Sequence, residues 1–173
     1  MPFEWRKHPA LQGRLRPDHP DDSQVIVHDG GPRITDRKPE LMWVTISAYE
    51  GDHFAGKVLN QPEQLETIRQ GEEIYFLVPK SGQYPDRISR EYLKERPHWI
   101  IHPCQQCGFS ELFDAPSDLI KAVFPDLPDD AVMEAFTVFC GMCGGVQLIQ
   151  HKDAVLDQSS MRASPRKWWQ FWK

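Results

Sequence analysis

The chain of 173 residues has no apolar run approaching the roughly 20 residues that a membrane-spanning helix needs. Its first stretch, residues 1–6, also lacks the apolar core of a signal peptide, which predicts a reducing compartment, the cytoplasm. The sequence contains neither a phosphate-binding glycine loop nor a nucleophile placed beside a base. We therefore expect a cytoplasmic protein that is not an enzyme.

Positive charge is scarce in one part of the sequence, residues 109–157. Aspartate and glutamate number 25 against 20 lysines and arginines, which gives a formal net charge of −5. Between Phe109 and Asp157 the net charge reaches −7, with nine acids and two bases, whereas residues 158–173 carry four bases and no acid. Because nucleic-acid binding relies on lysine and arginine to neutralise phosphates, a general affinity for nucleic acid is disfavoured.

The only cysteines of the sequence form two pairs, Cys104 with Cys107 and Cys140 with Cys143, and glycine follows each pair. A Cys-x-x-Cys turn can aim two sulfurs at one metal ion about 2.3 Å away, and the glycine lets the backbone fold sharply around the ion. Two such turns supply the tetrahedral thiolate shell that is typical of structural zinc. Because four thiolates leave no position for an activated water, we predict a structural zinc site and not a catalytic one.

Other uses of the four thiols remain open. Disulfides would need an oxidising compartment, and a thioredoxin-like redox dithiol usually has one Cys-x-x-Cys at the start of a helix. Iron in the same cage, as in rubredoxins, has the same ligands. The 32 residues between Cys107 and Cys140 exceed the roughly 15 to 20 of a compact zinc pattern, so we expect this intervening chain to carry structure of its own.

The pattern of the first part of the chain predicts a small β domain. The opening, through about Ser23, is rich in proline and charge and is expected to be irregular. Strands are predicted at residues 25–27, 42–49, 53–60 and 74–78, the middle two as a hairpin, and a short helix at 62–69 with Leu65 and Ile68 inward. The predicted core consists of Trp43, Val44, Ile46, Phe54, Val58, Ile74 and Phe76.

The second part of the chain is predicted to build the zinc ribbon. We expect a helix at residues 88–96 with Ser89 as its N-cap, and strands at 99–102, 136–139 and 146–149 around the cysteine pairs. Between the pairs, Ser117 can cap a helix whose apolar side is formed by Leu119, Ile120, Val123 and Phe124. The expected fold class is α+β: a mostly antiparallel β domain over 1–97, a ribbon with an inserted helix over 98–157, and a linker with a basic aromatic tail over 158–173.

Three strings in the first domain resemble a known family. They are M-W-V-T-I at residues 42–46, F-A-G-K-V-L-N-Q-P at 54–62 and G-E-E-I-Y-F at 71–76. They are similar to the W-V-x-V, G-x-L-x-N-x-P and G-(D/E)-x-V-x-F pattern of the YegJ-like bacterial domain of unknown function, family twenty-three fourteen. The resemblance covers about residues 40–78 and implies a small α+β domain without established chemistry. More loosely, the domain resembles bacterial toxin-immunity proteins.

Two histidines are candidates for a role beyond the core. His28 and Asp29 could form an acid–base pair, but neighbouring strand residues point to opposite faces, and the glycines that follow indicate a structural turn. His102 lies two residues before Cys104 and could hydrogen-bond a thiolate, or it could be a solvated strand residue. Neither histidine is needed as a ligand when four cysteines already fill the metal shell.

The function that these features favour is a non-enzymatic zinc-containing binding protein, possibly a bacterial immunity-type inhibitor of a toxin. An acidic ribbon would steer association with the basic cleft of a toxin that attacks nucleic acid. The alternatives are a nucleic-acid-associated zinc-ribbon adaptor, which only the basic tail supports, and an enzyme with an unrecognised site.

The tail has four aromatic residues in five positions, from Trp168 to Trp172, among basic residues. We expect it to pack on this protein or a partner chain, with its bases facing acids such as Asp126, Asp129 or Asp130. Contact with a membrane interface is the less favoured alternative.

Overall fold

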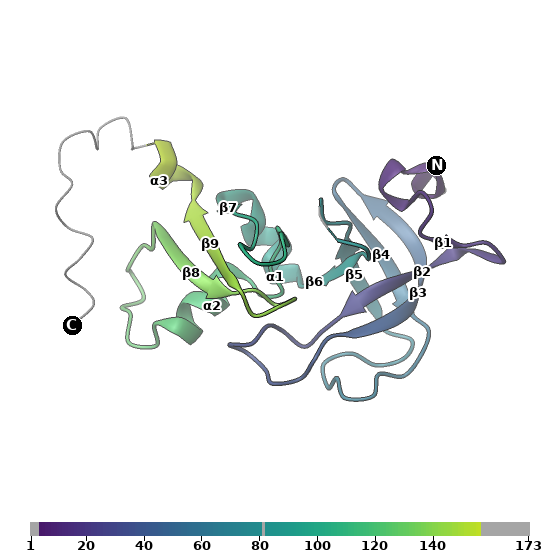
Figure 1. Ribbon diagram of the computed structural model, residues 1–173, viewed down its shortest axis with the longest axis horizontal. Helices are drawn as coiled ribbons and strands as arrows, with labels where there is room; N and C mark the ends of the chain where they lie inside the picture. Colours follow the sequence, from purple (N-terminus) through teal and green to yellow (C-terminus); the bar gives the residue numbers. More distant parts are fainter. Residues whose placement is uncertain (1–3, 81, 157–173) are drawn as a thin grey trace.

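The computed structural model describes residues 4–80 and 82–156, which form two lobes side by side along the long axis (Figure 1). The predicted tail at 158–173 lies outside the described residues, so its packing stays a prediction. The first lobe contains η1 (Glu4–Lys7), η2 (Pro9–Leu11), β1 (Leu15–Arg16), β2 (His19–Val27), β3 (Glu40–Glu50), β4 (His53–Val58), β5 (Glu73–Leu77) and β6 (Asp86–Ile88). The second lobe contains α1 (Arg90–Glu95), η3 (Arg96–His98), β7 (Trp99–Ile101), α2 (Pro116–Val123), β8 (Ala135–Phe139), β9 (Val146–His151) and α3 (Lys152–Leu156).

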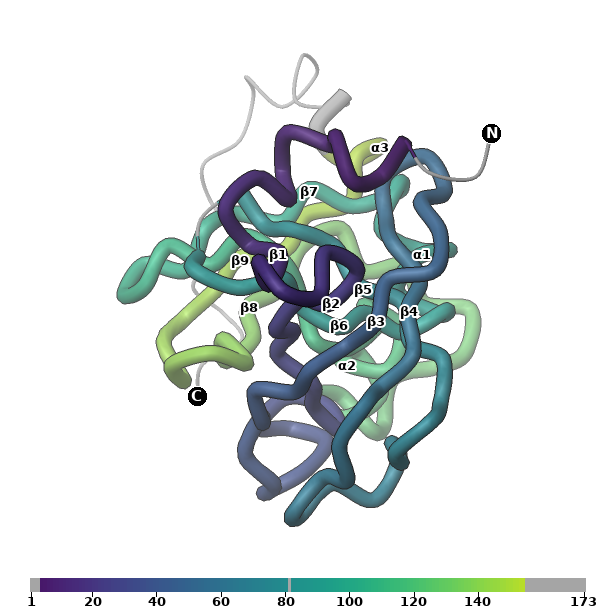
Figure 2. The backbone as a smooth tube through the Cα atoms, turned by 90° about the vertical axis from the view of Figure 1, so that its right-hand side faces the viewer, coloured from purple at the N-terminus to yellow at the C-terminus, as the bar shows by residue number. Residues whose placement is uncertain are grey.

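Strands β1 to β6 pair in chain order, and a further pairing between β2 and β6 closes five of them into a small barrel. The closing contact is parallel and places Ile26 opposite Asp86, while the other pairings of the sheet are antiparallel. Figure 2, viewed from the barrel side, shows the N-terminal segment lying over the strands. That segment is not irregular as expected, because η1 and η2 bring Trp5 and Leu11 into the barrel core and β2 already begins at His19.

Alternation along the strands decides which side chains fill the barrel. In β3, Met42, Val44 and Ile46 are buried, because residues two apart share one face of a strand. The predicted core residue Trp43 lies on the opposite face, where it is half-buried beneath the Arg16 guanidinium, 5.4 Å from the ring centroid. The prediction for Trp43 was therefore wrong. The remaining predicted core residues are all buried: Val44, Ile46, Phe54, Val58, Ile74 and Phe76.

Between β4 and β5, the predicted helix at residues 62–69 does not form. The backbone N–H groups of this segment donate hydrogen bonds to carboxylates outside it. Glu40 accepts from the N–H groups of Glu63 and Gln64, and Asp29 accepts from those of Glu66 and Thr67. These bonds replace helical ones and anchor the segment against the barrel. As predicted, Leu65 and Ile68 still point into the core.

The second lobe is a three-stranded antiparallel sheet in the order β7-β9-β8, and its strands lie at the three predicted positions. Ser89 caps α1 by accepting from the Tyr92 N–H, so the helix begins at Arg90, while Ile88 belongs to β6. Helix α2 begins one residue before the predicted cap, because Pro116 starts the first turn, where its missing N–H costs nothing. Its apolar side includes buried Leu119, whereas Phe124 beyond its end is 37% exposed and was wrongly assigned to that side.

The two lobes share a hydrophobic cluster. Leu77 of β5 and Ile88 of β6 pack with residues of the ribbon side, among them Tyr92, Leu112 and Phe136. The boundary predicted at residue 97 stays a prediction, and this cluster spans it. Mostly antiparallel strands with a few short helices confirm the α+β class. No helix within the described ranges has the length and apolar character that crossing a membrane requires.

Candidate metal centre

The two cysteine pairs form turns with the same hydrogen-bond pattern. In the first, the Cys104 N–H donates to the Phe109 carbonyl over 2.8 Å, and the Gly108 N–H donates to the Cys104 carbonyl over 2.9 Å. In the second, Cys140 donates to Gly145 over 2.7 Å and Gly144 donates to Cys140 over 2.8 Å. Each turn thus closes on itself within six residues, and both place two sulfurs on the same side.

Glycine at the fourth position after the first cysteine is required by the backbone. Gly108 and Gly144 have φ values of +78° and +75°, in the left-handed region that residues with a Cβ rarely adopt. We refer to the turns 104–109 and 140–145 as the first and second knuckle. The glycines that follow the cysteine pairs therefore have the role that the sequence predicted for them.

The four sulfurs lie close enough together to hold one metal ion. All four Sγ atoms are within 4.8 Å of one another, with 3.6 Å between Cys104 and Cys143 and 3.7 Å between Cys107 and Cys140. A tetrahedron with sulfurs about 2.3 Å from a central ion has edges of about 3.8 Å, so the spacing fits a four-thiolate shell. Disulfide sulfurs would be about 2.05 Å apart, and all four cysteines are free thiols.

The surroundings of the sulfurs differ in exposure. Cys104 and Cys140 are buried, whereas Cys107 and Cys143 are exposed. Burial raises the pKa of Cys140 far above its ordinary value. At Cys104 burial acts in the same direction, but the backbone N–H groups of Cys107 and Gln106 outweigh it and lower the pKa to about 7. A bound cation would stabilise all four thiolates and offset the cost of burying two of them.

An aromatic wall supports the buried sulfurs. Phe109 and Phe113 pack with Cys104 and Cys140, and Ile26 of the barrel joins them. A Cβ on Gly141 would lie 2.5 Å from the Phe113 ring, and a Cβ on Gly145 would lie 2.9 Å from the Cys104 sulfur. The second knuckle therefore reaches its position only because both residues lack side chains.

The two histidine candidates do not belong to the metal centre. His102 Nε2 pairs with Gln150 Oε1 at 2.5 Å and not with a thiolate. His28 is fully buried and stacks on Phe113 with ring centroids 3.7 Å apart, and its Nε2 donates to the Arg87 carbonyl. Burial lowers the pKa of His28 to about 3, so the ring is neutral. Its neighbour Asp29 accepts hydrogen bonds from the Glu66 and Thr67 N–H groups. Gly30 follows with a φ of +131°, which agrees with the predicted structural turn.

A polar network within the second lobe was not found from the sequence. The Glu111 carboxylate accepts from the Tyr92 hydroxyl at 2.5 Å and from Arg96 at 2.8 and 2.9 Å. Gln147 donates to three backbone carbonyls, those of His102, Phe109 and Glu111. These partners are far apart in the sequence, and no local pattern marks them. Through Gln147, the network holds β9, the strand after the second knuckle, against residues 109–111, which follow the first knuckle.

In comparisons with known proteins, no family model, no curated protein and no solved structure matches the chain. The resemblance to the YegJ-like family and to toxin-immunity proteins therefore stays a prediction from the motifs.

Proposed function

We propose that this protein is a zinc-stabilised binding protein without catalytic activity. The observation that carries the proposal is the closed set of four sulfurs, all within 4.8 Å of one another and held by two knuckles of the same hydrogen-bond pattern. Such a set satisfies Zn²⁺ completely and provides no position for a reacting water. The ion would join the chain before α2 to the chain after it, so its role is to hold the ribbon together.

The metal content of purified protein tests the first part of the proposal. We expect about one zinc ion per chain, because the four cysteines provide one complete tetrahedral shell. Elemental analysis distinguishes zinc from iron, and thiol titration after denaturation counts free cysteines. Metal-free protein with two disulfides, or protein that carries iron, would contradict the zinc assignment.

The second part of the proposal concerns a protein partner. The loop from Phe124 to Glu134 projects from the ribbon between α2 and β8, and Val132 in it is 81% exposed. Its exposed charged side chains are all acidic: Asp126, Asp129, Asp130 and Glu134. An exposed apolar residue among acids suits a partner with a basic surface, because opposite charges speed the encounter and apolar contact then stabilises it. A toxin that attacks nucleic acid has such a surface, so we infer an immunity-type inhibitor.

Association kinetics with the product of the adjacent gene test this inference. Replacing Asp126, Asp129 and Asp130 by asparagine should slow association about tenfold at low salt, since steering depends on the charges. The matched control replaces three exposed acids outside the loop, Asp18, Glu63 and Glu91, by their amides. Equal slowing in both triple variants would show that net charge matters and not this loop. Absence of any association would remove the adjacent product as the partner and the inhibitor inference with it.

A further inference from the structure

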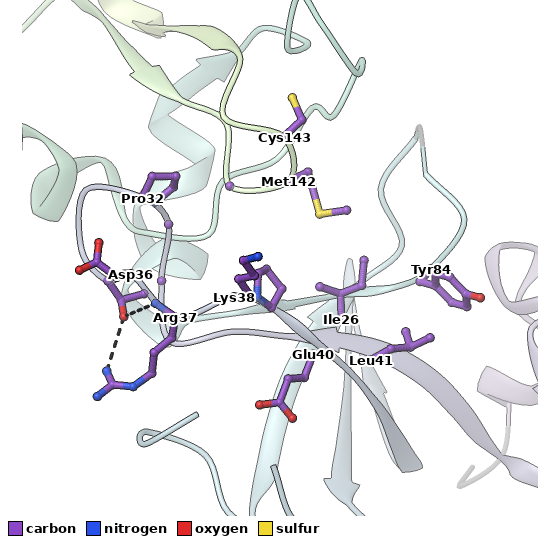
Figure 3. A pocket seen from close by; sticks show the side chains of 15 residues that line it. Ile26, Pro32, Asp36, Arg37, Lys38, Glu40, Leu41, Tyr84, Met142 and Cys143 are labelled. Carbon is purple, nitrogen blue, oxygen red and sulfur yellow. Dashed lines mark hydrogen bonds between the residues drawn. The ribbon is translucent and has the colours of Figure 1, made fainter. Parts of the chain in front are cut away.

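A cavity of about 700 Å³ lies where the barrel meets the ribbon (Figure 3). Three segments far apart in the sequence form its walls. They are the chain from Ile26 of β2 through the loop 30–39 to Leu41 of β3, Tyr84 in the connection before β6, and residues 141–143 of the second knuckle. The volume falls within the range of about 300 to 1,000 Å³ that is usual for sites of small ligands.

The walls of this cavity are mainly apolar. Figure 3 shows Met142 extending from the knuckle towards the barrel, opposite Ile26 and Leu41. Met142 and Leu41 are 42% and 40% exposed, so each leaves part of its apolar surface in contact with water. A ligand between them would remove apolar surface from water on both sides.

Two basic residues, Arg37 and Lys38, and two acidic ones, Asp36 and Glu40, line this cavity. Figure 3 shows the Lys38 side chain over the cavity towards the second knuckle, whereas the carboxylates of Asp36 and Glu40 point away from Met142. Glu40 accepts from two backbone N–H groups at 2.8 Å, and Arg37 pairs with Glu66. Within the part of the chain that the structure describes, Lys38 forms no ion pair.

We propose that this cavity binds a small organic anion with an apolar body. The acidic group of the ligand pairs with Lys38, and the apolar body lies between Met142 and Leu41. Charge complementarity selects the anion, because the cavity offers an unpaired ammonium beside apolar walls. Most of the affinity comes from the apolar body, since a partly exposed ion pair contributes little by itself. This site is separate from the acidic loop 124–134 and does not depend on a protein partner.

A pair of fluorescent probes tests the proposal on the full zinc-loaded chain. The first probe is 8-anilinonaphthalene-1-sulfonate, an apolar anion, and the second is its uncharged analogue N-phenyl-1-naphthylamine. We expect saturable binding of both with one site per chain. Lys38→Ala should weaken the sulfonate about fivefold and leave the uncharged probe unchanged, as loss of a partly exposed ion pair predicts. Leu41→Asp should weaken both probes at least about tenfold, because it places a charge on the apolar wall.

Two control variants locate the binding. Lys121→Ala removes a lysine from α2, and Val132→Asp adds an acid at the most exposed apolar residue of the acidic loop. Neither should change the affinity for either probe. Zinc content and thermal unfolding of each variant establish that it is folded before the affinities are compared.

The proposal is overturned if Lys38→Ala and Lys121→Ala weaken the sulfonate equally, or if Leu41→Asp leaves both affinities unchanged. None of these outcomes bears on zinc content or on the protein partner, which are measured separately.

Discussion

At the scale of single residues, His28 shows how burial determines chemistry. Its ring lies flat against Phe113, and its Nε2–H donates to a backbone carbonyl, while Nδ1 has no partner among the described residues. A protonated ring would carry a buried charge with an unpaired donor, which is costly. The neutral ring is therefore a packing element that joins the barrel to the aromatic wall behind the sulfurs.

The pH dependence of stability should report this state of His28. Its folded pKa of about 3 is below the ordinary 6.5, so below pH 6.5 the unfolded chain binds a proton that the folded chain does not. This residue alone then lowers the free energy of unfolding by about 1.4 kcal/mol per pH unit as the pH falls from about 6.5 towards 3. Burial raises the pKa of Asp114 to about 6, and this contribution has the opposite sign.

The difference between wild type and His28→Asn isolates the histidine. Urea unfolding at several pH values between 6.5 and 4.5, with zinc in excess, should give a shallower loss of stability with acid for the variant. Parallel pH profiles for the two proteins would show that His28 has the same pKa in the folded and unfolded states, which contradicts a depressed folded pKa.

Two neighbours in β3 should differ in their cost when truncated. Met42→Ala should lower the free energy of unfolding by about 2 to 5 kcal/mol, because the side chain is 1% exposed within the barrel core. Trp43→Ala should cost less than Met42→Ala, since the indole covers the outer face and its contact with Arg16 contributes only about 0.5 to 1 kcal/mol. Urea unfolding measures both. A larger loss for Trp43→Ala would indicate that the outer face is covered more completely than the structure shows.

At the scale of elements, α1 caps α2. Glu95 at the end of α1 accepts from the Ser117 N–H at 2.8 Å and from the Ser117 hydroxyl, in the first turn of α2. Ala115, the N-cap residue of α2, has no side-chain acceptor, so the carboxylate from the other helix satisfies the N-terminal donors. The position of a negative charge at a helix N-terminus is also electrostatically favourable.

A double-mutant cycle tests this capping between helices. Glu95→Ala and Ser117→Ala should each lower the free energy of unfolding by about 1 kcal/mol, as loss of a helix cap does. Together they should cost clearly less than the sum, because both remove the same interaction. Glu91→Ala, on the exposed side of α1, is the matched control and should be nearly neutral. Additive losses in the cycle would mean that the two residues act independently.

At the scale of the whole molecule, the barrel and the ribbon are expected to unfold together. Strands β5 and β6 belong to the barrel sheet, yet Leu77 and Ile88 pack in the cluster of the ribbon side. Ile26 of β2, another barrel strand, packs against the cluster that contains Cys104 and Cys140. Damage to the ribbon therefore exposes apolar surface of the barrel.

Removal of zinc tests this coupling. Cys104→Ser, or treatment of the wild type with a chelator, should lower the melting temperature of the whole protein, because metal-binding free energy is folding free energy. Calorimetry should show a single transition in both states. Two transitions, with the upper one insensitive to the chelator, would show that the barrel is stable alone. An unchanged melting temperature would mean that the site is not structural.

Whether the sequence predicts a feature of this molecule depends on how far apart in the chain the interacting residues lie. The knuckles and the β3–β4 hairpin depend on residues close in the chain, and their spacing and alternation are sufficient to identify them. Closure of the barrel through Ile26 and Asp86, the His28–Phe113 stack and the walls of the cavity join distant segments. The wrong assignment of Trp43 has another cause, since hydrophobicity alone does not say which of two adjacent strand residues faces inward.

The closed hydrogen bonds of each knuckle also have a kinetic consequence. Every one of them spans at most six residues, so either half of the metal site can form early, as local structure does. The halves are 32 residues apart, and their meeting requires a slower search through the intervening chain. An ion bound early in folding would be held by the two sulfurs of one half, and the other half would have to supply the remaining two sulfurs. Completion of the sulfur cage is thus expected to be a late step, and one that commits the chain to its native topology.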